Sequence, residues 1–170
     1  EINTVLDWEM CTLGDPLMDF GTSLSYWITE DDIDALKKGL PSPTVFKGNP
    51  NRTEIVEIYS KKSGRPINNL VFYYVYGLFK LAVIVQQIYY RYHKGFTSDK
   101  RFEHLNKHTQ LLFTIAWQAI QKNKIDIFFD LLIIKDESVS QCSCKVISET
   151  VANKRVRVLT DVITHLDHLN

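Results

Sequence analysis

The first residues whose types and spacing could do chemistry are acidic. Asp7 and Glu9 follow the short apolar run Val5-Leu6, which predicts a strand with a carboxylate at its end. Carboxylate oxygens are hard ligands that bind Mg²⁺ together with phosphate oxygens. Phosphoryl transfer needs such an ion, because its catalysis consists of positioning and charge stabilisation. An ordinary strand–turn–helix has the same pattern, so these residues alone leave a metal-binding and a structural Asp7 both open.

The segment after these carboxylates predicts a helix over residues 15–28. Asp15 can cap the free amides of the first turn, and Pro16 suits the first helical position because its missing N–H would have no partner there. The apolar residues of this segment recur at helical spacing and predict one buried face: Leu17, Phe20, Leu24 and Trp27.

Further helices are expected where breakers and apolar spacing allow them: 52–63, 67–93 and 99–121. The polar stretch 29–50 predicts a mobile excursion, in which a short helix at 31–38 is left open. Gly64 ends the 52–63 helix, and Pro66 opens the next one. The 67–93 segment is apolar on nearly every face, as expected of a membrane span or of the most buried helix of a helical lobe. Lys80 in its middle and its dispersed tyrosines favour the buried helix.

Composition excludes some classes of protein. A chain of 170 residues fits one domain or one lobe, and 45% hydrophobic residues suffice for a packed core. The 20 basic and 20 acidic side chains cancel, which removes the electrostatic footprint of a nucleic-acid binder. The three cysteines are an odd and dispersed set, so no disulfide framework is expected. A reducing, cytoplasmic location is expected instead.

Two histidines have the spacing of a metal pair. His104 and His108 lie four residues apart on a predicted helix and could present two imidazoles to zinc. No acidic third ligand lies nearby in the sequence, so a solvated helix face is favoured. The missing initiator Met and signal peptide predict that the chain is a piece of a longer protein.

Three stretches together resemble a known family. They are the run VLDWEMCTLGDPLMDFGTSLSYW, the stretch 51–66 with its SGRP ending, and the run FYYVYGLFKLAVIVQQIYYRYHKGFTSDKRF. In order and spacing they resemble the aminoglycoside phosphotransferase (choline-kinase-like) superfamily, closest to the kinase-like domain fused to acyl-CoA dehydrogenases. The resemblance implies a mainly α chain, namely the helical C-terminal lobe of a protein-kinase-like α+β fold, with a short strand at the start. The lobe portion is then 1–123, and 124–170 is a tail of unassigned type.

The resemblance also implies roles for individual residues. Asp7 corresponds to the aspartate that ligates Mg²⁺, and Asp15 to the acidic residue that braces the catalytic loop. Four more residues are site-adjacent candidates or possible contacts to substrate: Trp8, Glu9, Tyr73 and Arg91. The catalytic base, the second metal ligand and the nucleotide-binding lobe are expected upstream. The complete protein would therefore use ATP and Mg²⁺, while this chain alone is expected to be inactive.

The leading hypothesis is a phosphotransferase that acts on a hydroxyl group of a small molecule, such as a hydroxyacyl thioester or an aminoglycoside-like acceptor. The alternative is a non-catalytic helical interaction module or a degenerate kinase-like remnant. Neither nucleic acid nor membrane is expected as a partner, and the sequence gives no oligomeric state. The tail is expected to pack on the lobe through an apolar strip: Ile125, Phe128, Phe129, Leu132 and Ile133.

Overall fold

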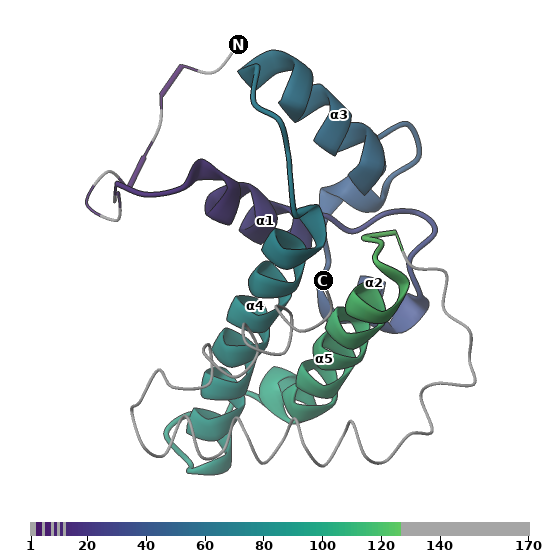
Figure 1. Ribbon diagram of the computed structural model, residues 1–170. Coiled ribbons are helices and arrows are strands. Elements are labelled where there is room, and N and C mark those ends of the chain that lie inside the picture. The colour runs from purple at the N-terminus through teal and green to yellow at the C-terminus, as the bar shows by residue number, and fades with distance from the viewer. Residues whose placement is uncertain (1–2, 5, 8, 10, 12, 127–170) are drawn as a thin grey trace.

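The computed structural model describes residues 3–4, 6–7, 9, 11 and 13–126. Within them the chain is mainly helical and contains no strand, which confirms the predicted fold class (Figure 1). The elements in order are α1 (Pro16–Tyr26), α2 (Asp34–Gly39), η2 (Pro43–Val45), α3 (Arg52–Ser63), α4 (Leu70–His93), η3 (Lys100–Phe102) and α5 (Leu105–Lys122).

The short strand expected at Val5-Leu6 is not found. Val5 lies outside the described residues, and Leu6 has irregular backbone. Asp7 has a φ of 60°, in the left-handed region that a strand does not use. A strand also needs a neighbour that accepts and donates its backbone hydrogen bonds. No described residue belongs to such a neighbour, so Leu6 has no strand partner within the part of the chain that the structure describes.

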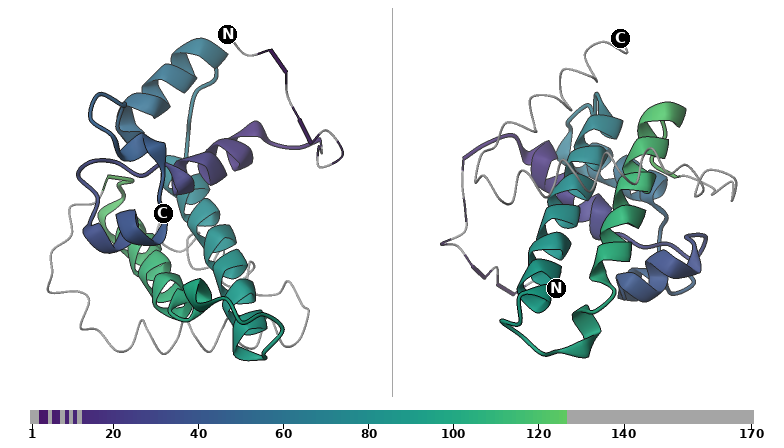
Figure 2. Two further views of the ribbon diagram at one scale, coloured as in Figure 1. Left: turned by 180° about the vertical axis from the view of Figure 1, so that it is seen from behind. Right: turned by 90° about the horizontal axis from the view of Figure 1, so that it is seen from below.

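The core lies where α4 packs between α1 and α5, and α2 packs on α5. Figures 1 and 2 show α4 and α5 side by side, with α1 crossing the first turns of α4. The most completely buried apolar side chains come from these helices and the residues beside them: Leu24, Ile28, Tyr74, Leu78, Ala82, Leu112 and Ala119. Removal of this apolar surface from water is the main driving force for the arrangement.

The crossing of α1 and α4 depends on two glycines. A Cβ on Gly21 would lie 2.2 Å from the carbonyl oxygen of Tyr73, and one on Gly77 would lie 2.4 Å from the carbonyl oxygen of Gly21. Any side chain at either position would therefore force the two backbones apart. This close approach fixes the start of α4 against α1.

The predicted α3 has the bounds that the sequence indicates. The side chain of Asn51 accepts from the backbone N–H of Glu54, and the Glu54 carboxylate accepts from the N–H of Asn51, which forms a capping box. Gly64 ends the helix with a φ of 67°. Tyr59 stacks on Phe20 of α1 with ring centroids 4.1 Å apart, so α3 is packed against α1.

Other helices differ from their predicted bounds. α4 begins at Leu70 and not at 67, because Asn69 adopts the left-handed conformation. α5 begins at Leu105, and the turn η3 replaces the first part of the helix expected from residue 99. The polar stretch 29–50 forms α2 and η2 and is tied to the core. There the Thr44 hydroxyl donates to the carbonyl of Ile28 at 2.8 Å.

α4 is less completely buried than expected. Seven of its 24 residues are buried, against four of the 11 residues of α1, so by this share α4 is not the most buried element. Its second half exposes Ile84 and Tyr90 at 39% and 44%. α4 is long and apolar enough to cross a membrane, a test that the core helix of a soluble protein also passes, and 39% of the qualifying window is buried.

Candidate functional site

The residues that precede α1 form an open segment. Every described residue from 3 to 15 is exposed, and among them are the two leucines Leu6 and Leu13. Figure 1 shows this segment extended away from the helices before it enters α1. The carboxylates that it carries are therefore accessible to solvent and to ligands.

Asp7 has the properties expected of a carboxylate that is free to bind a ligand. It is exposed, and no hydrogen bond or ion pair joins it to another described residue. A structural carboxylate in a protein interior would instead be paired or fully hydrogen-bonded. Its left-handed φ of 60° is uncommon for a residue other than glycine. Asp7 thus has the predicted accessibility, although it does not stand at the end of a strand.

Asp7 can supply one metal ligand, but not a complete site. Mg²⁺ takes an octahedral shell of oxygens, in which one or two carboxylates are joined by water and substrate phosphates. Within the described residues no group of three His, Cys, Asp or Glu side chains is placed to hold a metal ion. The hard oxygens of Asp7 fit the first of these requirements, and any remaining ligands would have to come from outside the described residues.

Asp15 is held by hydrogen bonds from two different helices. Its Oδ1 accepts from the backbone N–H of Leu17 at 2.9 Å, which caps α1 as predicted. Its Oδ2 accepts from the hydroxyl of Tyr73 in α4 at 2.6 Å. The Tyr73 bond, followed by the Leu17 bond, lowers the pKa of Asp15, and the same bond to Asp15 raises the pKa of Tyr73. Two residues that the sequence singled out separately therefore form one pair.

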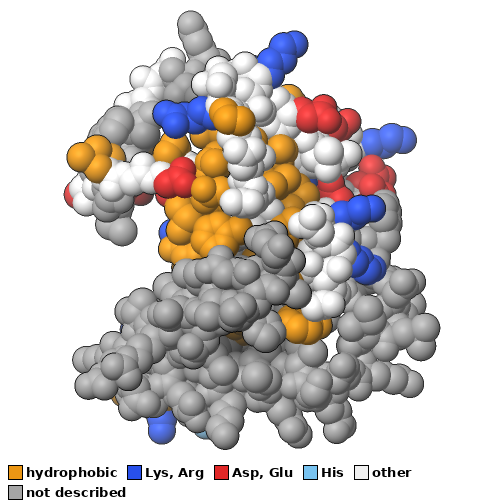
Figure 3. Space-filling view, in the orientation of Figure 1, with side chains coloured by type: hydrophobic (Ala, Val, Ile, Leu, Met, Phe, Trp, Pro, Cys, Tyr) orange, Lys and Arg blue, Asp and Glu red, His pale blue; other side chains and the backbone are white. Residues whose placement is uncertain are grey.

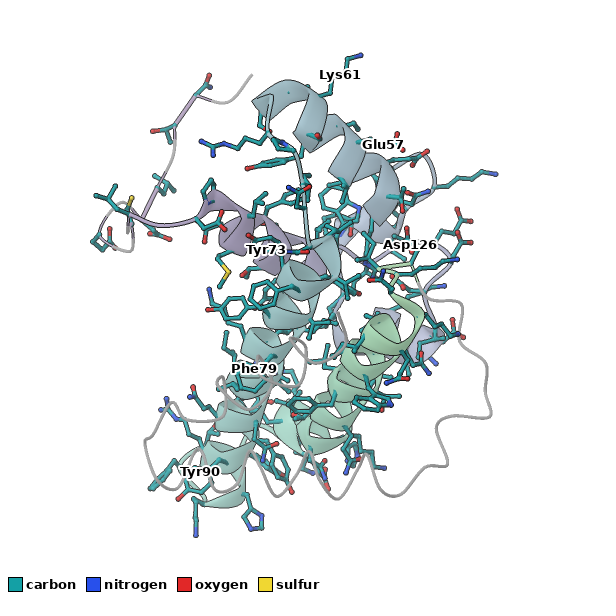
Figure 4. The ribbon with its side chains drawn as sticks, in the orientation of Figure 1. Glu57, Lys61, Tyr73, Phe79, Tyr90 and Asp126 are labelled. Atoms are coloured by element: carbon teal, nitrogen blue, oxygen red, sulfur yellow. The ribbon has the colours of Figure 1, made fainter. Side chains whose placement is uncertain are left out.

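Figure 4 places Tyr73 at the beginning of α4, where α1 crosses it. On the same side of the molecule, hydrophobic side chains gather around the start of α4 (Figure 3). Leu17 and Val71 are among the partly buried side chains that pack there against the core. The exposed Asp15 and the half-buried Tyr73 thus lie beside apolar side chains that pack against the core.

The other predicted site residues do not join this pair. Glu9 is exposed on the segment ahead of α1, and Trp8 lies outside the described residues. Arg91 is exposed in the last turn of α4. It lies 18 positions after Tyr73, which at about 1.5 Å per residue is roughly 27 Å along the helix axis. The structure therefore separates Arg91 from the residues at the start of α1.

Among the described residues no third His, Cys, Asp or Glu side chain joins the histidine pair in a group that could hold a metal ion. His104 is exposed just before α5, whereas His108 is half-buried against α2. A Cβ on Gly39 would lie 2.4 Å from Cδ2 of His108, which shows how closely the imidazole packs there. Burial, followed by the neighbouring His104, lowers the pKa of His108. The predicted solvated face is thus correct for His104 and wrong for His108.

Sequence reasoning missed a buried charged cluster around Arg52. Arg52 is 2% exposed, and its two terminal nitrogens donate to the two carboxylate oxygens of Asp32 at 3.0 and 2.7 Å. The guanidinium also lies 5.7 Å from the ring centroid of Tyr74, and burial raises the pKa of Tyr74 to about 12. Asp126 approaches Arg52 at 3.8 Å and accepts a hydrogen bond from Thr53 (Figure 4). We define these five residues as the Arg52 cluster.

The Arg52 cluster ties together segments that are distant in the sequence. Asp32 belongs to the loop after α1, Tyr74 to α4, and Asp126 to the chain after α5. A buried bidentate pair of this kind has a structural role, although Nε of Arg52 has no hydrogen-bond partner among the described residues. No local pattern in the sequence indicates it, because 20 residues separate Asp32 from Arg52.

Comparison with known proteins gives a match to a family model. Residues 1–41 match the model of the phosphotransferase enzyme family, and this match includes both Asp7 and Asp15. The helical structure is consistent with the helical lobe of a kinase-like fold. No solved structure gives a significant match.

The individual relatives are proteins named as acyl-CoA dehydrogenases. Acyl-CoA dehydrogenase family member 10 of Mus musculus is 32% identical over 143 residues, which are 82% of this chain and 13% of that protein. Acyl-CoA dehydrogenase family member 11 of Gallus gallus is 37% identical over 93 residues, 52% of this chain and 12% of that protein. Probable acyl-CoA dehydrogenase IBR3 of Arabidopsis thaliana is 29% identical over 95 residues, 54% of this chain and 12% of that protein.

These matches confirm the resemblance to phosphotransferases and to the acyl-CoA dehydrogenase branch. The chain spans about one-eighth of the length of these relatives. The mouse match covers 82% of the chain, which is more than residues 1–123 contain, so that similarity extends beyond the predicted lobe.

Proposed function

We propose that this chain is part of an ATP- and Mg²⁺-dependent phosphotransferase that acts on a hydroxyl group of a small molecule. The observation that carries the proposal is the match of residues 1–41 to the phosphotransferase enzyme family. The accessible, unpaired Asp7 supports it, because a metal ligand must present free carboxylate oxygens. The exposed carboxylate of Asp15, held at the start of α1, supports it further.

In the proposed reaction the γ-phosphoryl group of ATP passes to the oxygen of the acceptor hydroxyl. The bond between the γ-phosphorus and the β,γ-bridging oxygen breaks, a new phosphorus–oxygen bond forms, and the hydroxyl proton passes to a base outside this chain. Mg²⁺, when bound, neutralises charge on the phosphate oxygens. Asp7 would hold that ion through a carboxylate oxygen, and Asp15 would brace the loop that carries the base.

The relatives support a proposal for the class of acceptor. Their names place acyl-CoA chemistry in the same proteins, which favours a hydroxyacyl thioester over an aminoglycoside-like acceptor. The zero net charge of the chain gives no attraction for a polycation. We also propose a cytoplasmic location and partners that include neither nucleic acid nor membrane.

Hydrolysis of Mg-ATP by the complete protein tests the proposal without a known acceptor, because water then takes the phosphoryl group. Asp7→Asn should lower this turnover more than tenfold, since a tenfold loss corresponds to about 1.4 kcal/mol of transition-state stabilisation. Asp31→Asn is the matched control, because Asp31 is equally exposed and lies outside the site. Its turnover should equal that of the wild type. Both variants should keep the wild-type unfolding midpoint.

The isolated 170-residue chain should show no turnover, because the proposal places the base and the nucleotide-binding lobe outside it. Wild-type complete protein without any turnover would favour the alternative, a non-catalytic helical interaction module or a degenerate kinase-like remnant. Turnover that is indifferent to Asp7→Asn would remove Asp7 from the metal site.

A further inference from the structure

The Asp15 carboxylate accepts one hydrogen bond more than a helix cap requires. Capping α1 requires a single hydrogen bond from the first turn, and the N–H of Leu17 provides it through Oδ1. The second oxygen accepts a 2.6 Å hydrogen bond from Tyr73, which is 58 residues away in the sequence. The cap therefore leaves the Tyr73 bond unexplained.

The donor of this second bond is held rigidly. The backbone of Tyr73 lies at the α1–α4 crossing, where a Cβ on Gly21 would meet its carbonyl oxygen at 2.2 Å. The next residue, Tyr74, is fully buried in the core. Since the Tyr73 side chain has few rotatable bonds, the place of its hydroxyl is set by the packing of the two helices.

The carboxylate that Tyr73 holds keeps capacity for further partners. An ionised carboxylate has about four acceptor positions, and Leu17 and Tyr73 occupy one on each oxygen of Asp15. Asp15 is exposed, so the other positions remain accessible to a neighbouring loop. Tyr73 has a single hydroxyl hydrogen, and Asp15 already receives it. Tyr73 is therefore not available as a donor to an acceptor molecule.

We propose that Tyr73 is a positioning residue of the phosphotransferase site, whose hydroxyl fixes the Asp15 carboxylate in the orientation in which Asp15 braces the catalytic loop. This role rests on the proposed function. In this role Tyr73 does not contact the substrate, in contrast to the expectation from the sequence. It acts through Asp15 alone, so removal of the Tyr73 hydroxyl should matter when Asp15 is present and not when it is absent.

The test is a double-mutant cycle on the complete protein, with Mg-ATP hydrolysis as the assay. Tyr73→Phe removes the hydroxyl and keeps the ring. Asp15→Ser keeps a side-chain oxygen that can cap α1 but is too short to keep the Tyr73 bond. Tyr90→Phe is the matched control, because it makes the same change on an exposed tyrosine at the other end of α4.

Tyr73→Phe should lower kcat roughly three- to tenfold, as expected for the loss of one solvent-exposed hydrogen bond. The KM for ATP should change less than about twofold, because the pair orients a loop and does not bind nucleotide. In the Asp15→Ser background, Tyr73→Phe should have no further effect. Tyr90→Phe should leave both constants unchanged.

Three outcomes would overturn the positioning role. One is unchanged kcat in Tyr73→Phe, and another is an undiminished effect of that substitution in the Asp15→Ser background. The third is a loss of kcat in Tyr73→Phe that is fully explained by a smaller fraction of folded protein at the assay temperature, which would make the pair structural. Absence of turnover in the wild type would remove the proposed function itself and this role with it, whereas the three outcomes above arise in an active enzyme.

Discussion

Asp15 and Asp32 both accept hydrogen bonds from a helix that is distant in the sequence. They differ in their exposure to solvent. The side chain of Asp32 is 9% exposed and accepts from both terminal nitrogens of Arg52 and from the backbone N–H of Thr29. Asp15 accepts one bond on each oxygen and is open to solvent. The protein uses nearly all the acceptor capacity of Asp32 and about half of that of Asp15.

This difference separates a structural carboxylate from a candidate functional one. A buried charge is tolerated only when its partners replace the lost water, so Asp32 and Arg52 depend on each other for stability. An exposed carboxylate with free acceptor positions contributes little to stability and can serve a loop or a metal ion. Asp7 represents the extreme case, because no described residue pairs with it.

The largest effect on stability should come from breaking the Arg52 cluster. Arg52→Met keeps much of the side-chain volume but leaves Asp32 with a buried, unpaired charge. We expect a loss of about 3–5 kcal/mol in the free energy of unfolding. Urea titration of the chain followed by circular dichroism would measure it.

Arg101→Met is the matched control for that experiment. Arg101 pairs with Asp99 at 2.6 Å, but its side chain is 83% exposed. Because exposed ion pairs add little to stability, its urea midpoint should stay at the wild-type value. Equal losses in the two variants would show that burial does not separate the two kinds of pair.

A smaller loss should follow from a methyl group at the crossing that holds Tyr73. Gly21→Ala places a Cβ 2.2 Å from a backbone oxygen of α4, so the helices must move apart. Overpacking of this kind costs about 1–3 kcal/mol, and a backbone contact belongs at the upper end. Gly14→Ala has nothing within 4 Å of its new Cβ and should be neutral. A neutral Gly21→Ala would mean that the crossing is not as tight as described.

The smallest effect concerns the pH dependence of Asp15. The bonds from Tyr73 and Leu17 lower the pKa of Asp15 below its ordinary value of 3.8 in the folded chain. The unfolded state therefore binds the proton more readily, and stability from this group is present above pH 3.8 and lost as the pH falls through the folded pKa.

Thermal unfolding of the wild type and Tyr73→Phe between pH 6 and pH 2.5 would detect this contribution. The wild type should have a slightly higher midpoint at pH 6, and the difference should vanish at the acid end. A difference that stays constant across this range would assign the effect of the hydroxyl to packing and not to the ionised carboxylate.

Local signals in the sequence predicted some elements well. α3 has its start and end where Asn51 and Gly64 place them, because a cap and a left-handed glycine act within a few residues. α4 starts three residues later than Pro66 suggests, since Asn69 adopts a left-handed conformation that its residue type permits but does not require. Leu6 is not in the strand expected at Val5-Leu6, and a strand depends on a partner elsewhere that local signals do not indicate.

Part of the candidate site could be predicted, because its residues lie close together in the sequence. Asp7 and Asp15 lie in one short run that carries the family resemblance, so the sequence could single them out. The Asp15–Tyr73 bond and the Arg52 cluster join residues that are brought together only by the packed helices. The apolar strip expected in the tail is described only at Ile125, which is buried as predicted, and its other members lie outside the described residues.

The proposal depends most on Asp7 as a metal ligand. Mn²⁺ binding to the complete protein, with a non-hydrolysable ATP analogue present, tests this role most directly. Electron paramagnetic resonance of free Mn²⁺ would give the affinity of the wild type, Asp7→Asn and Asp31→Asn. Loss of one carboxylate from the metal shell should weaken binding about tenfold or more in Asp7→Asn, and Asp31→Asn should bind as the wild type does. Equal affinity in all three proteins would contradict the assignment of Asp7 to the metal.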